Sequence, residues 1–297
     1  MEYPNWKVTG LFTYPIKSCK GTSLQQARIG THGMPDDRRF MIVEKSTGMF
    51  VAQRGDGDSG IGIKSMCQIT PTLIEGDDGS PIFRQRLEVT APGMNKLTIF
   101  PLNIWHDDGN VREVQVWGSK LEAAIGDLEH NQWFTEFLSR ERPGDYEFVM
   151  MRAGSQRRAK HGYSQLRFAD GYPFLVISQE SLDDLNQRIG GDEPLPMNRF
   201  RPNIVISGGN PYDEDRINRM LIGNVDFEGM KLCVRCPTTQ TDQETAKRGK
   251  EPIKTLLTYR PSPYGDGGVV LGRNFNHLSN DTISVGDTVQ ALAYQAQ

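Results

Sequence analysis

The fold class of this chain is decided by residues 40–53, which read FMIVEKSTGMFVAQ. Two apolar runs, Phe40 to Glu44 and Met49 to Gln53, flank a short turn that contains Gly48. Short apolar runs joined by a glycine turn are typical of a β-hairpin, because glycine adopts the backbone conformations that tight turns need. We therefore expect a hairpin here, in a chain built mainly of strands.

The same signature recurs on both sides of this hairpin. Short apolar runs predict further strands at residues 7–14, 87–90, 97–100, 111–117, 174–177, 203–207, 226–235 and 282–291, the last with a Gly286-Asp287 turn. Two helices are expected, one with Trp133 and Phe137 on its apolar face and Asn131 as its cap, the other from Ser178 to Gly190. The fold is expected to be mostly β (α+β) with a few short helices.

Length and composition bound the class of protein. At 297 residues the chain is about twice the usual length of one domain, and Pro143-Gly144 offers a boundary between residues 1–140 and 145–297. A net charge of −3 provides no global basic field, which argues against nucleic-acid binding. No signal-peptide pattern is present, and no window reaches the roughly 18 apolar residues that span a bilayer, so a cytoplasmic protein is expected.

Four cysteines occur, Cys19, Cys67, Cys233 and Cys236, and they do not make a disulfide scaffold in a chain of this length. Cys233 and Cys236 form a C-x-x-C motif. A structural zinc site would need a second such pair, and a thioredoxin-type pair would open a helix, whereas a proline-containing loop follows here. Two small buried residues, or one activated thiolate, are the other interpretations. A thiolate at Cys236 beside Arg235 would suit a redox metal, because a nearby cation lowers the pKa of a thiol.

Candidate anion-binding residues lie at turns and strand starts. They are Lys17 and Ser18 in the turn YPIKSCKG, then Arg38, Arg201 and Arg235. Each cation could pair with a carboxylate of the protein, or all could converge on one anionic ligand, and the sequence leaves both open. Asp170, shortly before the strand at 174, is a candidate catalytic or supporting carboxylate. No Ser-His-Asp elbow, P-loop or dinucleotide-binding glycine motif is present.

Six motifs, in order along the chain, are similar to those of a known family. They are YPIKSCKG (14–21), DRRFMIVEKSTGMFVAQR (37–54), NRFRPNIVISGGNPYDED (198–215), LIGNVDFEG (221–229), CVRCPTTQTDQETAKRGKEPIKTLLTYR (233–260) and ISVGDTV (283–289). The chain resembles the MOSC family, and within it the amidoxime-reducing components, from about Val8 to Val289. The resemblance implies an N-terminal MOSC β-barrel domain with a terminal helix at 1–140 and a MOSC β-barrel domain at 145–297.

The resemblance also implies a molybdenum–molybdopterin cofactor whose metal is bound by Cys236, a catalytic residue, with Cys233 not a ligand. By matching motif, the implied cofactor contacts are Lys17, Ser18, Arg38, Gly171, Tyr172, Arg201, Asn203, Val234, Arg235, Cys236 and Asn274. The chain departs from the family pattern at Val234, where the family has Ser, at Gly171-Tyr172, where it has Thr-Ser, and at Asn274, where it has an aromatic residue. These departures predict an altered cavity lining and an altered substrate range.

The implied activity is the reduction of N-hydroxylated compounds such as amidoximes and hydroxylamines, with nitrite as a further candidate substrate. The chain carries no haem, flavin or iron–sulfur signature, so electrons should come from a b-type cytochrome and its NADH-dependent reductase, or from a ferredoxin-type donor. A monomer is expected. A place on the mitochondrial outer membrane, facing the cytosol, would require an anchor preceding these residues. A non-enzymatic carrier of the cofactor or its sulfur, and a zinc-stabilised β-barrel binding module, stay open as alternatives.

Overall fold

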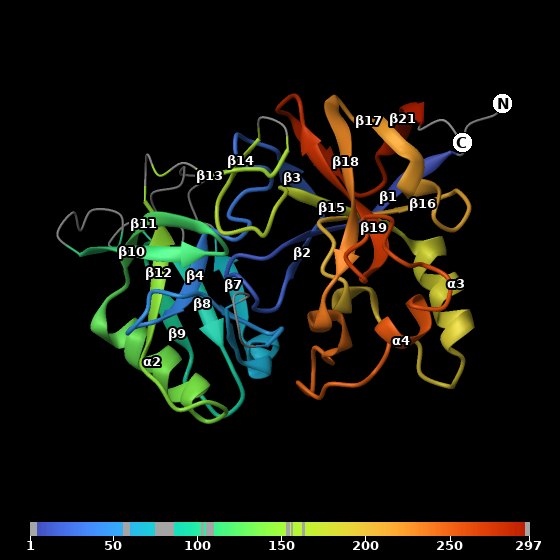
Figure 1. The fold of residues 1–297 in the computed structure, drawn as a ribbon. Coiled ribbons are helices and arrows are strands. Elements are labelled where there is room, and N and C mark those ends of the chain that lie inside the picture. Colours follow the sequence, from blue (N-terminus) through green and yellow to red (C-terminus); the bar gives the residue numbers. More distant parts are fainter. Residues whose placement is uncertain are drawn as a thin grey trace.

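The computed structural model describes residues 5–55, 60–74, 86–101, 104, 110–152, 155, 157–161 and 164–294. Within these residues the protein is mostly β with only three α-helices, which confirms the fold class expected from the sequence. A closed barrel forms one lobe of the molecule, and smaller sheets form the other (Figure 1).

Seven strands close the barrel. In order around it they are β16 (Ile204–Ser207), β15 (Phe174–Ser178), β19 (Val269–His277), β18 (Val225–Arg235), β17 (Ile217–Ile222), β21 (Thr288–Tyr294) and β1 (Trp6–Thr13), which pairs with β16 again, while β2 (Thr22–Leu24) pairs with the outer part of β1. Only β15 and β16 run parallel among these neighbours. Trp6, Val8 and Leu11 pack with Phe227 and Phe275 in the barrel core. Trp6 and Val8 follow the alternation of a strand, and an irregularity in pairing between Val8 and Gly10 shifts that pattern before Leu11.

The second lobe contains a four-stranded and a three-stranded sheet, and one helix packs against them. One sheet has the order β10 (Val111–Val116), β11 (Ser119–Ile125), β12 (Tyr146–Met151) and β4 (Phe40–Glu44), and the other β7 (Thr70–Ile74), β8 (Arg86–Thr90) and β9 (Leu97–Ile99). Helix α2 (Leu128–Ser139) covers β12 (Figure 1). Phe148 of β12 stacks between Phe40 and Phe134 of α2, with ring centroids 5.2 and 5.1 Å apart. These buried aromatic rings join the sheet to the helix.

The remaining elements are short. Two-stranded pairs are β5 (Val51–Ala52) with β6 (Ile61–Gly62), β13 (Arg157–Arg158) with β14 (Gln165–Leu166), and β20 (Thr282–Ser284) with β3 (Gln26–Arg28). The other helices are α3 (Gln179–Ile189) and α4 (Ile253–Leu256), and the 3-10 turns are η1 (Lys64–Gln68), η3 (Met197–Arg199), η4 (Asp213–Arg216) and η5 (Pro237–Gln240). In the described part of the chain, no helix has the length and apolar character needed to cross a membrane.

Two local predictions are confirmed. In the hairpin at 40–53, the backbone N–H of Glu44 donates to the carbonyl of Met49 at 2.9 Å, and Gly48 takes the left-handed conformation with φ of 69°. In α3, the Ser178 hydroxyl accepts from the backbone N–H of Ser181 at 3.1 Å, and the helix ends at Gly190 with φ of 67°. Both elements are specified by cap and turn residues within a few positions.

The cap expected at Asn131 is wrong. Helix α2 has Asp127 as its N-cap, so Asn131 lies one turn inside the helix. There its amide donates to the carbonyl of Gly126 at 2.9 Å and accepts from the N–H of Phe148 at 2.8 Å. The Asn131 side chain therefore joins the helix to β12. Asparagine serves both as a helix cap and as a partner of nearby backbone groups, and the sequence alone does not distinguish the two roles.

Strand pairing does not follow the division expected at residues 140–145. β1 lies at the start of the chain but belongs to the barrel, between β21 and β16. β12 begins at Tyr146 but pairs with β4 and β11 in the other lobe. The division into residues 1–140 and 145–297 stays a prediction, and the chain crosses between the lobes at these two places.

Candidate active-site cavity

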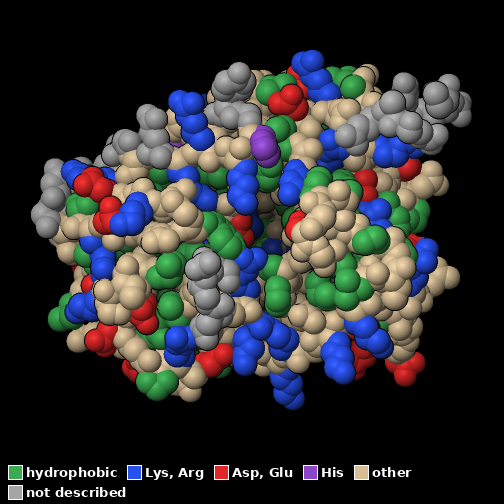
Figure 2. Space-filling view, viewed as in Figure 1, with side chains coloured by type: hydrophobic (Ala, Val, Ile, Leu, Met, Phe, Trp, Pro, Cys, Tyr) green, Lys and Arg blue, Asp and Glu red, His purple; other side chains and the backbone are tan. Residues whose placement is uncertain are grey.

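A cavity of about 360 Å³ is lined by residues from both lobes. Figure 2 shows a hollow near the middle of this face, with Lys and Arg side chains at several points of its rim. The cations that line the cavity are Lys17, Arg38, Arg54, Lys160, Arg199, Arg201, Lys231 and Arg235, and Asp170 is the acidic residue among the described residues that line it. The whole chain has a net charge of −3, so positive charge is concentrated here.

The residues singled out from sequence all line this one cavity. They are Lys17, Ser18, Arg38, Asp170, Gly171, Tyr172, Arg201, Asn203, Val234, Arg235, Cys236 and Asn274. The structure therefore brings together residues up to 257 positions apart in sequence (274 minus 17). Their individual roles stay predictions.

Lys17 is buried at the end of β1, with 4% of its surface exposed. Its amine donates to the carbonyl of Phe168 at 2.9 Å and forms an ion pair with Asp170. Burial lowers the pKa of Lys17 to about 8, and Asp170 partly offsets that effect. Asp170 also accepts from the indole N–H of Trp117 at 3.1 Å. A carboxylate held this way orients Lys17.

The protonation state of Asp170 bears on its predicted catalytic role. Its side chain is 65% exposed and lines the cavity. The protein around Asp170 desolvates its carboxylate, which raises the pKa. The positive charges of Lys17 and Arg54 outweigh that effect and hold the pKa of Asp170 well below its ordinary value. Asp170 is thus a carboxylate at neutral pH, which favours a supporting role over donation of a proton to a substrate.

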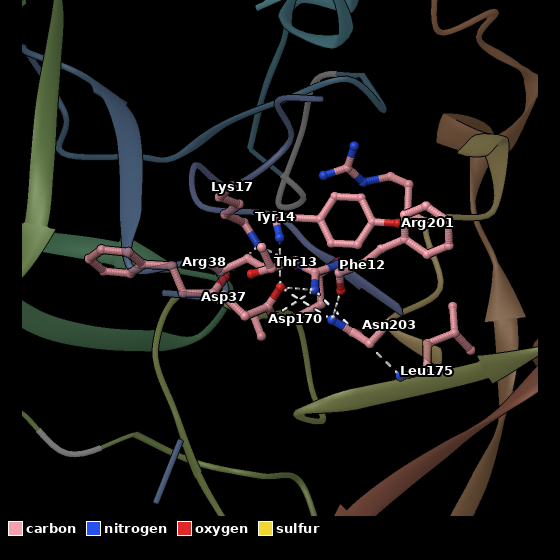
Figure 3. Close-up of polar contacts among 12 residues, drawn as sticks. Phe12, Thr13, Tyr14, Lys17, Asp37, Arg38, Asp170, Leu175, Arg201 and Asn203 are labelled. Carbon is pink, nitrogen blue, oxygen red and sulfur yellow. Dashed lines mark hydrogen bonds and ion pairs between the residues drawn. The ribbon is translucent and has the colours of Figure 1, made fainter. Parts of the chain in front are cut away.

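Asp37 organises the part of the cavity wall that holds Arg38. Its carboxylate accepts from the N–H of Tyr14 at 2.9 Å, from the Arg38 guanidinium at 2.6 Å and from the Asn203 amide at 3.2 Å (Figure 3). The Asn203 oxygen in turn accepts from the N–H of Leu175 at 3.3 Å. This buried network joins four segments, namely the end of β1, the turn before β4 and the starts of β15 and β16, and it fixes the position of Arg38.

Tyr14 supports the two arginines on this wall. The guanidinium carbons of Arg38 and Arg201 lie 4.2 and 4.3 Å from the centroid of its ring, within cation–π range. Burial raises the pKa of Tyr14 to about 12, although both arginines lower it. A Cβ at Gly21 would lie 2.4 Å from the Tyr14 ring, so the turn after Lys17 can pack against it only with glycine.

Four lining residues have a left-handed backbone. Ser18, Arg38, Trp117 and Arg201 have φ values of 67°, 45°, 56° and 56°. This conformation costs a non-glycine residue about 1–2 kcal/mol, and such residues cluster at functional sites. The guanidinium of Arg201 is fixed by a hydrogen bond of 2.6 Å to the carbonyl of Cys19. The chain thus accepts strain where it presents cations and a tryptophan to the cavity.

The two cysteines of the C-x-x-C motif differ in chemistry. Cys236 follows β18 directly and is the N-cap of η5. Burial raises the pKa of the Cys236 thiol, but Arg54, Thr238 and Arg235 together bring it below the ordinary value. Burial keeps the pKa of Cys233 raised even though Arg235 lies 2.9 Å from its sulfur. Cys236 is therefore the more acidic thiol of the pair.

Arg54 and Trp117 belong to the cavity but were missed by sequence reasoning. The Arg54 guanidinium lies 4.3 Å from the Trp117 ring centroid, and it lowers the pKa of Cys236 more than the adjacent Arg235 does. Arg54 is the last residue of the motif at 37–54, which was a usable signal. Trp117 lies in the turn between β10 and β11. In the sequence it looked like the last residue of the strand expected at 111–117, and nothing there indicated a place in a cavity.

A zinc site finds no support. Across the described ranges, no group of three or more His, Cys, Asp or Glu side chains could hold a metal ion. Cys19 and Cys67 are buried, and burial raises the pKa of both thiols. Neither is suited to supply a thiolate for a second pair.

The fold and this cavity define a MOSC protein. The MOSC N-terminal beta barrel domain matches residues 5–141, and the MOSC domain matches residues 164–290. A Bos taurus protein named mitochondrial amidoxime reducing component 2 is 31% identical over 264 residues, which cover 85% of this chain and 72% of that protein. A Mus musculus mitochondrial amidoxime-reducing component 1 is 31% identical over 298 residues, covering 96% and 82%. The chain therefore belongs to the MOSC family.

Two other comparisons are less specific. A molybdenum cofactor sulfurase of Oryza sativa is 31% identical over 266 residues, which cover 84% of this chain but 30% of that protein. Among solved structures, the YUAD protein from Bacillus subtilis overlaps 99% of this chain with a TM-score of 0.36 and 9% identity. That structural likeness is too weak to support an argument.

Proposed function

We propose that this protein binds a molybdenum–molybdopterin cofactor through Cys236 and reduces N-hydroxylated compounds, such as amidoximes and hydroxylamines. The observation that carries the proposal is that Cys236, whose pKa is lowered by nearby groups, lines the same cavity as a concentration of positive charge. Relatives of the same family are named for amidoxime reduction. Nitrite is a further candidate substrate.

The lining fits an anionic cofactor. Arg54, Arg201 and Arg235 form no ion pair with a described residue. In addition, the Nε atoms of Arg199 and Arg235 are buried without a hydrogen-bond partner there. Buried polar groups are normally satisfied, so these atoms point to a polar ligand that completes them. A phosphate-bearing pterin offers such oxygen acceptors.

Cys236 is the residue proposed to bind the metal. A thiolate is the form that binds metal, and Cys236 is the cysteine of the pair whose pKa lies below its ordinary value. Cys233 keeps its proton and contacts Arg235, which suits a role in holding that guanidinium. A single cysteine ligand also leaves metal positions open for a substrate.

The remaining residues act on charge and orientation. Lys17, held by Asp170, and Arg38, held by Asp37, present fixed positive charge to the anionic ligand. Arg201 does so from a strained backbone. The bound cofactor would supply the two-electron reduction of the N–O bond, and the chain would contribute a walled cavity that limits water.

Electrons are proposed to come from a separate protein, by family analogy a b-type cytochrome with its NADH-dependent reductase, or a ferredoxin-type donor. The alternative function is a carrier of the cofactor or of its sulfur at Cys236, without turnover. The likeness to a molybdenum cofactor sulfurase is the observation that keeps this alternative open.

The test uses protein purified from a host that makes the cofactor. Metal analysis should find about one molybdenum per chain, and reduced dye plus benzamidoxime should yield benzamidine. Cys236→Ser should lose both the metal and the product, whereas the matched variant Cys233→Ser should keep most of each. Molybdenum without product would favour the carrier, and equal loss in both variants would contradict Cys236 as the single ligand.

A further inference from the structure

The mouth of the cavity carries its own group of basic side chains. Lys160 and His161 are exposed residues that follow β13, and Lys231 is a half-buried residue of β18. We call these three residues the basic mouth. They differ from Lys17, which is buried at the end of β1. The cavity therefore has a buried set of cations and an accessible one.

Two residues of the cavity lining, Gly171 and Asn274, contact the basic mouth. The backbone N–H of Lys160 donates to the carbonyl of Gly171 at 3.1 Å, and a Cβ at position 171 would lie 3.3 Å from Cδ of Lys160. Glycine at 171 thus gives the Lys160 side chain room. On the other side, the Asn274 amide donates to the carbonyl of Lys231 at 3.0 Å.

The two lysines of the basic mouth have no ion-pair partner among the described residues. The Lys231 amine lies 3.9 Å from the ring centroid of Tyr264. Lys231 is near enough to Asp266 to lower the pKa of that carboxyl, but the Asp266 carboxylate accepts from the N–H of Gly268 at 3.0 Å and forms no ion pair with the lysine. Both amines are therefore available to an external anion.

A buried hydroxyl completes the group. The Tyr172 hydroxyl lines the cavity and is buried without a hydrogen-bond partner in the described structure. Its ring stacks on His161, with centroids 6.3 Å apart and planes 25° from parallel. A buried hydroxyl without a partner is unfavourable for the protein, so a ligand oxygen that accepts its hydrogen bond would remove that cost.

We infer that the basic mouth and Tyr172 bind a carboxylate of the substrate, so that this protein prefers N-hydroxylated compounds that carry a carboxylate. The inference rests on the proposed function and adds the substrate class. The buried set, Lys17 with Arg38 and Arg201, already offers cations to the cofactor phosphate. Lys160 is exposed and Lys231 is half-buried, whereas Lys17 is buried. A substrate that arrives after the cofactor can therefore still reach the two amines.

The experiment compares two substrates that share one reacting group. Benzamidoxime and 4-carboxybenzamidoxime are reduced by the same cofactor-loaded enzyme with the same dye, and the ratio of their kcat/KM values is measured. We expect the ratio to favour the carboxylate by about fivefold or more at low salt and to fall as salt rises, since exposed charges are screened. Lys160→Gln and Lys231→Gln should each lower the ratio about two- to fivefold through KM, as partly exposed ion pairs do.

Three further measurements separate the outcomes. Lys254→Gln removes an exposed lysine outside the cavity and should leave the ratio unchanged. Molybdenum content should be equal in all variants, and a loss in Lys160→Gln or Lys231→Gln would assign those cations to the cofactor and overturn the inference. Tyr172→Phe, which keeps the ring, should lower the ratio about twofold or more.

Binding of the two products keeps the inference testable without turnover. Calorimetry with 4-carboxybenzamidine and benzamidine should give the same preference and the same loss in Lys231→Gln. Tighter binding of the carboxylate without reduction of either substrate would contradict the proposed function alone. Equal kcat/KM values and equal affinities would contradict the inference and leave the reductase intact.

Discussion

The replacement Asp37→Asn should destabilise the protein strongly, although it changes a single buried oxygen. The Asp37 side chain is 2% exposed and its Arg38 partner 15% exposed. The carboxylate accepts from Tyr14 N–H, from Asn203 and twice from Arg38. Asparagine has one acceptor oxygen in place of two, turns an N–H₂ toward the donors and leaves the Arg38 charge unpaired. Breaking a buried ion pair in this way costs about 3–5 kcal/mol.

The matched control is Asp226→Asn. Asp226 also pairs with an arginine, Arg219, at 2.5 Å, but that arginine is 53% exposed. Water can replace the lost partner there, so the expected cost is about 1 kcal/mol or less. Free energies of unfolding from denaturant titration at pH 7 measure both costs, which are large against a typical total of about 5–15 kcal/mol.

Cofactor content gives a second readout for the same pair of variants. Because Asp37 holds Arg38 in the cavity, Asp37→Asn should also lower the molybdenum content of the purified protein, and Asp226→Asn should not. A similar destabilisation in both variants, or an Asp37→Asn protein with wild-type stability, would refute the argument that this network fixes the cavity wall.

Three further outcomes are expected. Arg54→Met should raise the pKa of the Cys236 thiol, seen as slower alkylation of cofactor-free protein at pH 7, whereas Arg158→Met, outside the cavity, should leave the rate unchanged. Burial raises the pKa of Glu214 to about 7, so the folded state keeps this proton at pH values where the unfolded state has lost it. The free energy of unfolding should therefore fall by up to about 3 kcal/mol as pH rises from about 4.5 to 7. Denaturant titrations of Glu214→Gln should lack this contribution to the pH dependence. Arg201→Gly should be about 1 kcal/mol more stable than Arg201→Ala, because φ at 201 is 56°, and the reverse order would contradict the strained backbone.

Local signals predicted the elements whose boundaries lie within a few residues. The Gly48 turn and the Ser178 cap each specify their element without help from distant residues. β12 was not predicted, because all of Tyr146–Met151 is buried and the run lacks the alternation of a half-exposed strand. Its identity as a strand depends on pairing with β4 and β11 on its two sides.

For the cavity, sequence motifs supplied the residues but not their partners. Lys17, Arg38, Arg201 and Cys236 could be named from motifs, yet each cation could equally have paired with a surface carboxylate. Arg38 does pair with Asp37, and it lines the same cavity as Lys17 and Arg201. That these cations bind one anionic ligand stays a prediction. The sequence indicated that Arg235, the neighbour of Cys236, lowers the pKa of its thiol. In the structure Arg54 lowers that pKa more than Arg235 does.

The sequence by itself determined the strand-rich class, the hairpin and helix signals, and which residue types are available for anion and metal binding. Only the tertiary structure decided that Arg54 faces Cys236, that Asp37 fixes Arg38, and that Lys160 and Lys231 share one opening. The physical reason is that charge interactions depend on distance through space. Here those distances are set by closure of the barrel and by two strands: β1, from the start of the chain, pairs in the barrel, and β12, which follows residue 145, pairs in the other lobe.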